Sequence, residues 1–212
     1  MKYFLLFALT FAGLFMLQIT PSISKGMKVS ETIKTIKPDN TPIATFAGGC
    51  FWCVESEFRT LNGVLFTISG YSGGHIPNPT YKDITTGQSG HAEVTDIYYD
   101  PEIISYRELT DFFLRKAHDP TQLNRQGVDV GTQYRSAIFY HNDEQKNIAA
   151  TAIKDANSDK VWKNPIVTTL EPLDKFWPAE EYHQQYYEKY EKENGRPHIR
   201  VLYKMQKKAL SK

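Results

Sequence analysis

The order of the apolar segments along the chain is the feature that most restricts its fold. Four segments have the composition and flanking turn residues of strands: 43–47, 64–69, 92–99 and 134–140. Residues 50–61 and 106–117 carry apolar side chains at helical spacing instead. Together they spell βαββαβ, which predicts an α+β fold with a ferredoxin-like two-layer core, a mixed sheet with helices packed on it.

Three further segments predict extensions at the C-terminal end of this core. They are a helix over 142–161, a strand over 166–170 and a helix over 178–193 with Pro178 in its first turn. The long stretches 70–90 and 118–133 are rich in glycine and polar residues, and we expect loops there.

The N-terminal segment indicates export. Met1 and Lys2 precede an apolar run over residues 3–17 and small residues up to 24, as in a signal peptide. About 15 apolar residues is short for a membrane span, which needs roughly 20, but residues 19–23 could extend the run into an uncleaved anchor. We therefore expect a signal peptide or membrane anchor over 1–24 and an exported, extracytoplasmic chain.

The rest of the chain divides by composition. We expect a polar linker over 25–40, one catalytic domain over 41–200 and a basic tail over 201–212. The formal net charge of +1 gives no indication of a nucleic-acid partner, and we expect a monomer.

Two cysteines, Cys50 and Cys53, are the whole thiol content of the chain. This count excludes both a disulfide scaffold and a four-cysteine metal site. Cys50 follows a predicted strand and the pair Gly48-Gly49, and it opens a predicted helix. Amide groups and the helix dipole favour a thiolate at such a position, so we expect Cys50 to be reactive.

Three kinds of site are compatible with this pair of cysteines. A C-x-x-C at the start of a helix is typical of thioredoxin-like disulfide exchange. Zinc is a second possibility, because His91 and Glu93 match half of a zinc deaminase signature, although the order of the two halves is reversed here. The third is a thiol that reduces sulfoxides. A purely structural exported domain remains the alternative to all three.

The sequence around Cys50 resembles the active-site motif of the A-type peptide-methionine sulfoxide reductases, since Cys50 stands in the run Gly-Cys-Phe-Trp. Further blocks resemble that family in the same order, and the resemblance covers roughly residues 43 to 200. These blocks lie at 70–74, 78–81, 90–94, 118–121, 129–136 and 178–184.

The resemblance implies reduction of methionine S-sulfoxide, free or in proteins, with Cys50 as the nucleophile and with neither metal nor cofactor. It implies an aromatic wall around the substrate methyl group, a protonated carboxylic acid and two phenols at the sulfoxide oxygen, and an accessory carboxylate. By this resemblance, Phe51 and Trp52 form the wall and Glu93 is the acid. Tyr81 and Tyr134 supply the phenols, and Asp129 is the accessory carboxylate. We expect His91 to be structural.

Cys53 departs from the pattern of many family members, which have glycine there and resolving cysteines near the C-terminus. A sulfenic acid on Cys50 condenses readily with a nearby thiol, and Cys53 is the only other one. We expect a Cys50–Cys53 disulfide that a thioredoxin-like partner reduces, or dithiothreitol in vitro. The alternative is direct reduction of the sulfenic acid by an external thiol.

Overall fold

The computed structural model describes residues 41–200. The predicted leader (1–24), linker (25–40) and basic tail (201–212) lie outside the described residues. Within 41–200, no helix combines the length and the apolar character that a membrane crossing requires.

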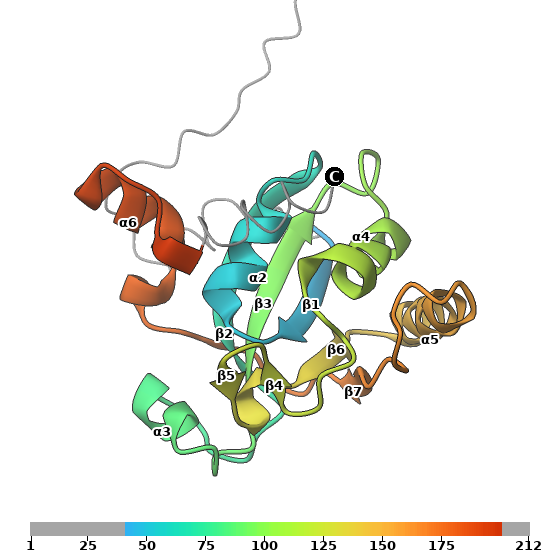
Figure 1. Cartoon of the computed structure of the whole chain (residues 1–212), viewed down its shortest axis with the longest axis horizontal. Helices are drawn as coiled ribbons and strands as arrows, with labels where there is room; N and C mark the ends of the chain where they lie inside the picture. Colours follow the sequence, from blue (N-terminus) through green and yellow to red (C-terminus); the bar gives the residue numbers. More distant parts are fainter. Residues whose placement is uncertain (1–40, 201–212) are drawn as a thin grey trace, which may run out of the picture.

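The core is a six-stranded mixed sheet with the strand order β7-β6-β1-β3-β2-β8 (Figure 1). The four central strands form antiparallel pairs, β6 with β1, β1 with β3 and β3 with β2, whereas β7 runs parallel to β6. This confirms the predicted ferredoxin-like α+β arrangement. The strands are β1 (Ile43–Gly48), β2 (Val64–Ser72), β3 (Ala92–Tyr99), β6 (Ser136–Tyr140), β7 (Thr169–Pro172) and β8 (Trp177–Pro178).

Helices cover one face of this sheet and bury the main apolar cluster against it. In Figure 1, α2 and α4 lie over β1 and β3, and α5 lies at the β6–β7 side. Phe46 of β1 stacks on Phe58 of α2 and on Phe113 after α4, with ring centroids 5.4 and 4.7 Å apart. Each such ring contributes roughly 1.5–3 kcal/mol by burial. The helices are α2 (Phe51–Phe58), α4 (Tyr106–Phe112), continued by a π-helical turn (Phe113–Ala117), and α5 (Asp143–Ser158).

Within residues 41–200, a short connection rather than a helix covers the opposite face of the sheet. Residues 173–176 join β7 at one edge of the sheet to β8 at the other. Leu173 and Phe176 pack there against Val94 and Phe139. The connection brings the C-terminal part of the chain back beside β2, and α6 (Tyr186–Asn194) then packs near α2.

The structure corrects the predicted helix over 178–193. Pro178 pairs with Gly70 at the edge of the sheet, and Ala179 N–H donates to Ser69 O at 2.9 Å. The Gln184 side chain also bonds both backbone groups of Ser69. These bonds to β2 hold the segment extended, so a single 3-10 turn (Glu181–His183) precedes α6.

Smaller corrections concern the loops. The glycine-rich stretch contains α3 (Tyr81–Thr85), whose start is fixed by a capping box between Thr80 and Asp83. The predicted 118–133 loop contains a hairpin of β4 (Arg125–Gln126) and β5 (Asp129–Val130). Strand β7 begins at Thr169, three residues later than the expected start at 166.

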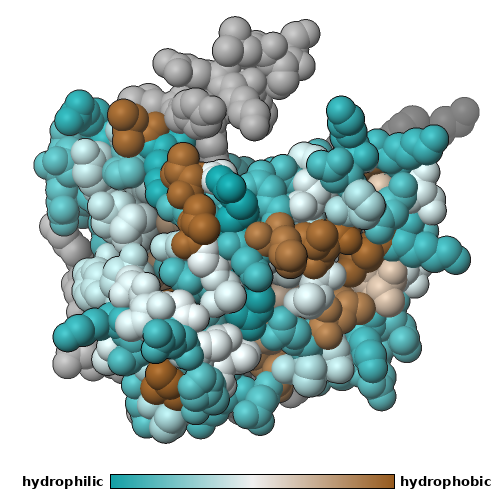
Figure 2. Space-filling view, turned by 60° about the horizontal axis from the view of Figure 1, so that its bottom comes forward, coloured by the Kyte–Doolittle hydropathy of each residue, from teal (hydrophilic) through white to brown (hydrophobic). Residues whose placement is uncertain are grey.

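Apolar side chains reach solvent in several places. On the face shown in Figure 2, hydrophobic residues form separate patches with hydrophilic residues between them. The β4–β5 hairpin contributes two of the most exposed ones, Val128 at 86% and Val130 at 66% exposure. These two valines stand on either side of Asp129.

Candidate active site

The turn between β1 and α2 places Cys50 at the start of the helix. Gly49 has φ +89°, and a Cβ on it would lie 2.4 Å from Cβ of Gln126, so only glycine fits there. Cys50 is the N-cap residue of α2, with 7% of its surface exposed.

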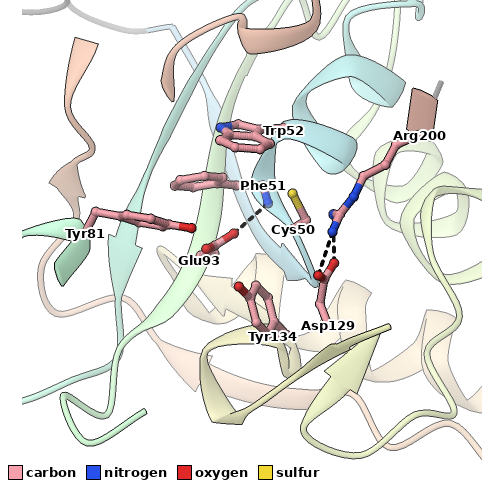
Figure 3. Close-up of a pocket in the computed structure, with 8 residues that line it drawn as sticks. All are labelled: Cys50, Phe51, Trp52, Tyr81, Glu93, Asp129, Tyr134 and Arg200. Atoms are coloured by element: carbon pink, nitrogen blue, oxygen red, sulfur yellow. Dashed lines mark hydrogen bonds and ion pairs between the residues drawn. The ribbon is translucent and has the colours of Figure 1, made fainter. Parts of the chain in front are cut away.

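Cys50 lies in a small pocket of about 50 Å³, which is enough for a few water-sized groups and suits the end of one side chain. Figure 3 shows its lining side chains, which come from the start of α2, from α3, β3, β5, the 3-10 turn Thr132–Tyr134 and the C-terminal segment. Seven of the eight residues proposed from sequence meet here. The lining residues are Cys50, Phe51, Trp52, Tyr81, Glu93, Asp129, Tyr134 and Arg200.

Glu93 stands on β3 at the floor of the pocket with 2% exposure. Burial raises its pKa from 4.5 to about 8, although its hydrogen bond from Phe51 N–H, 3.0 Å long, works in the opposite direction. Asp129 nearby raises the pKa further by charge repulsion. Glu93 is therefore protonated at neutral pH and can donate a proton to a group in the pocket.

In the resting site, the neighbours of Cys50 act against the thiolate that the helix start predicts. A hydrogen bond with Cys53, burial, and the nearby Glu93 all raise the pKa of the Cys50 thiol above its ordinary value. The Cys50 side chain makes no capping hydrogen bond, and the first amide of α2, Phe51 N–H, binds Glu93 instead. These neighbours favour the thiol form of Cys50 over its anion.

Two phenols complete the polar side of the pocket. Burial raises the pKa of both Tyr81 and Tyr134, so both hydroxyls stay protonated and can donate hydrogen bonds. The Tyr81 backbone N–H donates to Glu180 at 2.9 Å, and Glu180 also accepts from Tyr71. Tyr134 ends the 3-10 turn that follows the β4–β5 hairpin.

Phe51 and Trp52 form the aromatic side of the pocket (Figure 3). The Trp52 indole donates to Nδ1 of His183 at 3.1 Å and stacks on Tyr186 at 3.8 Å. Burial lowers the pKa of His183 to about 4, so its ring is neutral and accepts this bond. The wall is therefore held in one orientation by C-terminal residues that sequence reasoning did not identify.

Cys53 is the predicted site residue that does not line the pocket. It lies in the first turn of α2, where its N–H donates to Cys50 O at 2.9 Å. Its sulfur lies 3.1 Å from the hydroxyl of Tyr187 on α6. Both cysteines are in the free thiol form, and the two thiols are hydrogen-bonded.

His91 does not join the cysteines, which argues against the zinc interpretation. Its Nδ1 accepts from Gly74 N–H at 3.1 Å and its Nε2 is 2.8 Å from Ile76 O. Both ring nitrogens are thus engaged by backbone groups. In the part of the chain that the structure describes, no cluster of three or more potential metal-ligating side chains is found.

Arg200 lines the pocket but carries no local sequence signal of a site. It follows Gly195, Pro197 and His198 at the very end of the expected domain. Only the folded path of the chain brings it opposite Cys50.

Comparison with known proteins identifies a family for this chain. A family model described as peptide methionine sulfoxide reductase matches residues 42–212. The chain is 53% identical over 146 residues to the peptide methionine sulfoxide reductase MsrA of Methanosarcina acetivorans, covering 69% of this chain and 77% of that protein.

Two crystal structures are also similar. One is Mxr1 from Saccharomyces cerevisiae in reduced form, with a TM-score of 0.68 and 39% identity over 76% of this chain and 90% of that chain. The other is Mxr1 in complex with Trx2, with a TM-score of 0.51 and 34% identity over 72% and 91%. With more than half of its length matched by the family model, the chain belongs to the peptide methionine sulfoxide reductase family.

Proposed function

We propose that this chain reduces methionine S-sulfoxide to methionine by attack of the Cys50 sulfur on the sulfoxide sulfur. One observation carries the proposal: a cysteine and a buried, protonated carboxylic acid share a small pocket with an aromatic wall. A methyl sulfoxide has an apolar side and a basic oxygen. Phe51 and Trp52 suit the methyl group, and Glu93 suits the oxygen.

In the first step, Glu93 gives its proton to the sulfoxide oxygen while the Cys50 sulfur bonds to the substrate sulfur. The proton that Cys50 loses returns to the Glu93 carboxylate, so the acid is restored. The oxygen then moves to Cys50 as a hydroxyl group: the S–S bond to the substrate and the S–O bond of the substrate both break, and an S–O bond forms on Cys50. Methionine sulfur is reduced by two electrons, and Cys50 is oxidised by two electrons to the sulfenic acid.

The polar side chains around Glu93 support this step. Tyr81 and Tyr134 keep their phenolic protons and can hydrogen-bond the oxygen as charge develops on it. Asp129 raises the pKa of Glu93 and so helps to keep it protonated. Its own role is accessory to substrate binding.

In the second step, the Cys53 thiol attacks the sulfenic sulfur of Cys50, which forms the Cys50–Cys53 disulfide and releases water. The hydrogen bond between the two thiols supports this route. Tyr187 lies 3.1 Å from the Cys53 sulfur, and because its hydroxyl stays protonated it can relay the Cys53 proton to the departing hydroxyl group, which leaves as water.

A dithiol of the thioredoxin class then reduces the Cys50–Cys53 disulfide and is itself oxidised to a disulfide. The structure of the related Mxr1 in complex with Trx2 supports this choice of reductant. Dithiothreitol can replace it in vitro, since it is also a dithiol.

Both free methionine sulfoxide and oxidised methionine in proteins are proposed substrates. The exposed Val128 and Val130 beside Asp129 support a protein substrate, because they offer apolar contacts to residues flanking the oxidised methionine.

An extracytoplasmic location, with the segment 1–24 as a signal peptide or anchor, is proposed from the charged start and apolar run alone. Membrane fractionation of cells with an epitope-tagged full chain tests this location.

The decisive experiment is an epimer-resolved assay with dithiothreitol as reductant. We expect the protein to consume the S epimer of a methionine sulfoxide peptide and to leave the R epimer. Cys50→Ser should abolish this activity. Retained turnover in Cys50→Ser would remove the nucleophile assignment. Reduction of insulin disulfides without any sulfoxide reduction would identify a disulfide exchanger instead.

A further inference from the structure

The C-terminal segment returns to the pocket after α6. Gly195, with φ +66°, ends the helix, and residues 196–200 run back towards Asp129. The Arg200 guanidinium donates two hydrogen bonds to the Asp129 carboxylate, at 2.8 and 2.7 Å. In Figure 3 this ion pair closes one side of the pocket, with Cys50 between Arg200 and the aromatic wall.

Aromatic packing holds this return path in place. The His198 ring stacks on Tyr187 at 5.2 Å and meets Tyr190 edge-on at 4.8 Å. Tyr187 in turn contacts the Cys53 sulfur. Arg200 is therefore positioned by a packed segment on one side and by a two-point carboxylate contact on the other.

The charges around Cys50 are otherwise unfavourable to its anion. Of the eight residues that line the pocket, Arg200 is the only cationic one, whereas Glu93 and Asp129 are acidic. Arg200 lowers the pKa of the Cys50 thiol, while Cys53 and Glu93 raise it. The titratable or charged groups facing Cys50 are Cys53 from α2, Tyr81 from α3, Glu93 from β3, Asp129 from β5, Tyr134 from the 3-10 turn, Tyr187 from α6 and Arg200.

We propose that Arg200 is a positioning residue of this active site, which closes the pocket through Asp129 and supplies the positive charge that stabilises the developing Cys50 anion. This inference rests on the proposed function in taking Cys50 as the nucleophile. An arginine suits the role because it stays charged and its planar fork matches a carboxylate at two points. Asp129 partly offsets the charge, so the two residues act on Cys50 in opposite directions.

The test measures the reactivity of Cys50 without any sulfoxide. In a Cys53→Ser background, Cys50 is the only thiol of the chain, so its alkylation by iodoacetamide reports its ionisation alone. The rate is measured from pH 6 to 10. Arg200→Met should shift the profile to higher pH by about one unit, which slows alkylation at neutral pH on the order of tenfold.

Two variants separate charge from structure. Asp129→Asn keeps an oxygen that can accept one hydrogen bond from Arg200 but removes the negative charge, so it should shift the profile to lower pH. Arg59→Met is the matched control, because Arg59 pairs with Glu188 of α6 at 2.7 Å, outside the pocket. It should leave the profile unchanged.

An unchanged profile in Arg200→Met, or an equal shift in Arg59→Met, would overturn the proposal. Arg200→Lys guards against a folding defect, since it keeps the charge and should retain most of the wild-type profile. Failure of the proposed function would instead appear as absent sulfoxide reduction, while the alkylation profiles remain interpretable.

Discussion

Replacing Glu93 by glutamine should stabilise the fold in a pH-dependent way while it removes the acid. The pKa of Glu93 is raised from 4.5 to about 8 by burial. Below pH 4.5 the folded and unfolded chains both hold this proton. Between 4.5 and 8 the unfolded chain loses it while the folded chain keeps it, so the free energy of unfolding of the wild type falls as pH rises.

The size of the effect follows from the pKa difference. A difference of about 3.5 units, at about 1.4 kcal/mol per unit, corresponds to about 5 kcal/mol above pH 8 and about 3 kcal/mol at pH 7. Glutamine has nothing to ionise, and its carbonyl can still accept the hydrogen bond from Phe51 N–H. The variant should therefore gain this much stability relative to the wild type, with no gain near pH 4.

Urea denaturation of both proteins from pH 4.5 to 9 measures the difference, and it should rise steadily and level off above pH 8. Burial raises the pKa of Glu55 to about 7, but Glu55 is present in both proteins, so its contribution to the pH dependence cancels in the difference. Single-turnover sulfoxide reduction should fall at least roughly 100-fold in Glu93→Gln, because the amide has no acidic proton to give. A stability difference that stays constant with pH would refute the reasoning.

Three other substitutions test the neighbourhood of the site. Cys53→Ser should still reduce one sulfoxide per chain but lose steady-state turnover with a dithiol reductant; unchanged turnover in a coupled assay would contradict its resolving role. Tyr187→Phe removes the hydroxyl 3.1 Å from the Cys53 sulfur and should slow disulfide formation several-fold, measured as loss of free thiol after one equivalent of sulfoxide. An unaltered rate would argue against proton relay. Gly49→Ala should lower the free energy of unfolding by roughly 2–3 kcal/mol, since its Cβ would meet Gln126. Gly127→Ala, with nothing within 4 Å of a Cβ, is its control and should cost roughly 1 kcal/mol in the same denaturation experiment; equal losses would show that the contact with Gln126 is unimportant.

The central strands and helices could be predicted from local patterns because their side-chain periodicity reflects one buried face. The predicted strand over 92–99 is β3 without change, and the predicted helix over 142–161 is α5, which begins one residue later and ends three residues earlier. The segment 178–193 could not be predicted in this way. Its apolar residues suit a helix, but hydrogen bonds with Ser69 and strand pairing with Gly70, both on a distant strand, keep its first part extended.

The sequence alone determined which chemical groups stand near Cys50, since a glycine pair, a strand end and a helix start are all local features, and the resemblance to a family supplied the distant partners. Only the tertiary structure decided their protonation states and the arrival of Arg200. Burial and the electric field depend on every neighbour in space. For that reason the helix amide that was expected to favour the Cys50 anion binds Glu93, and a cation from the end of the domain takes up that task in our proposal.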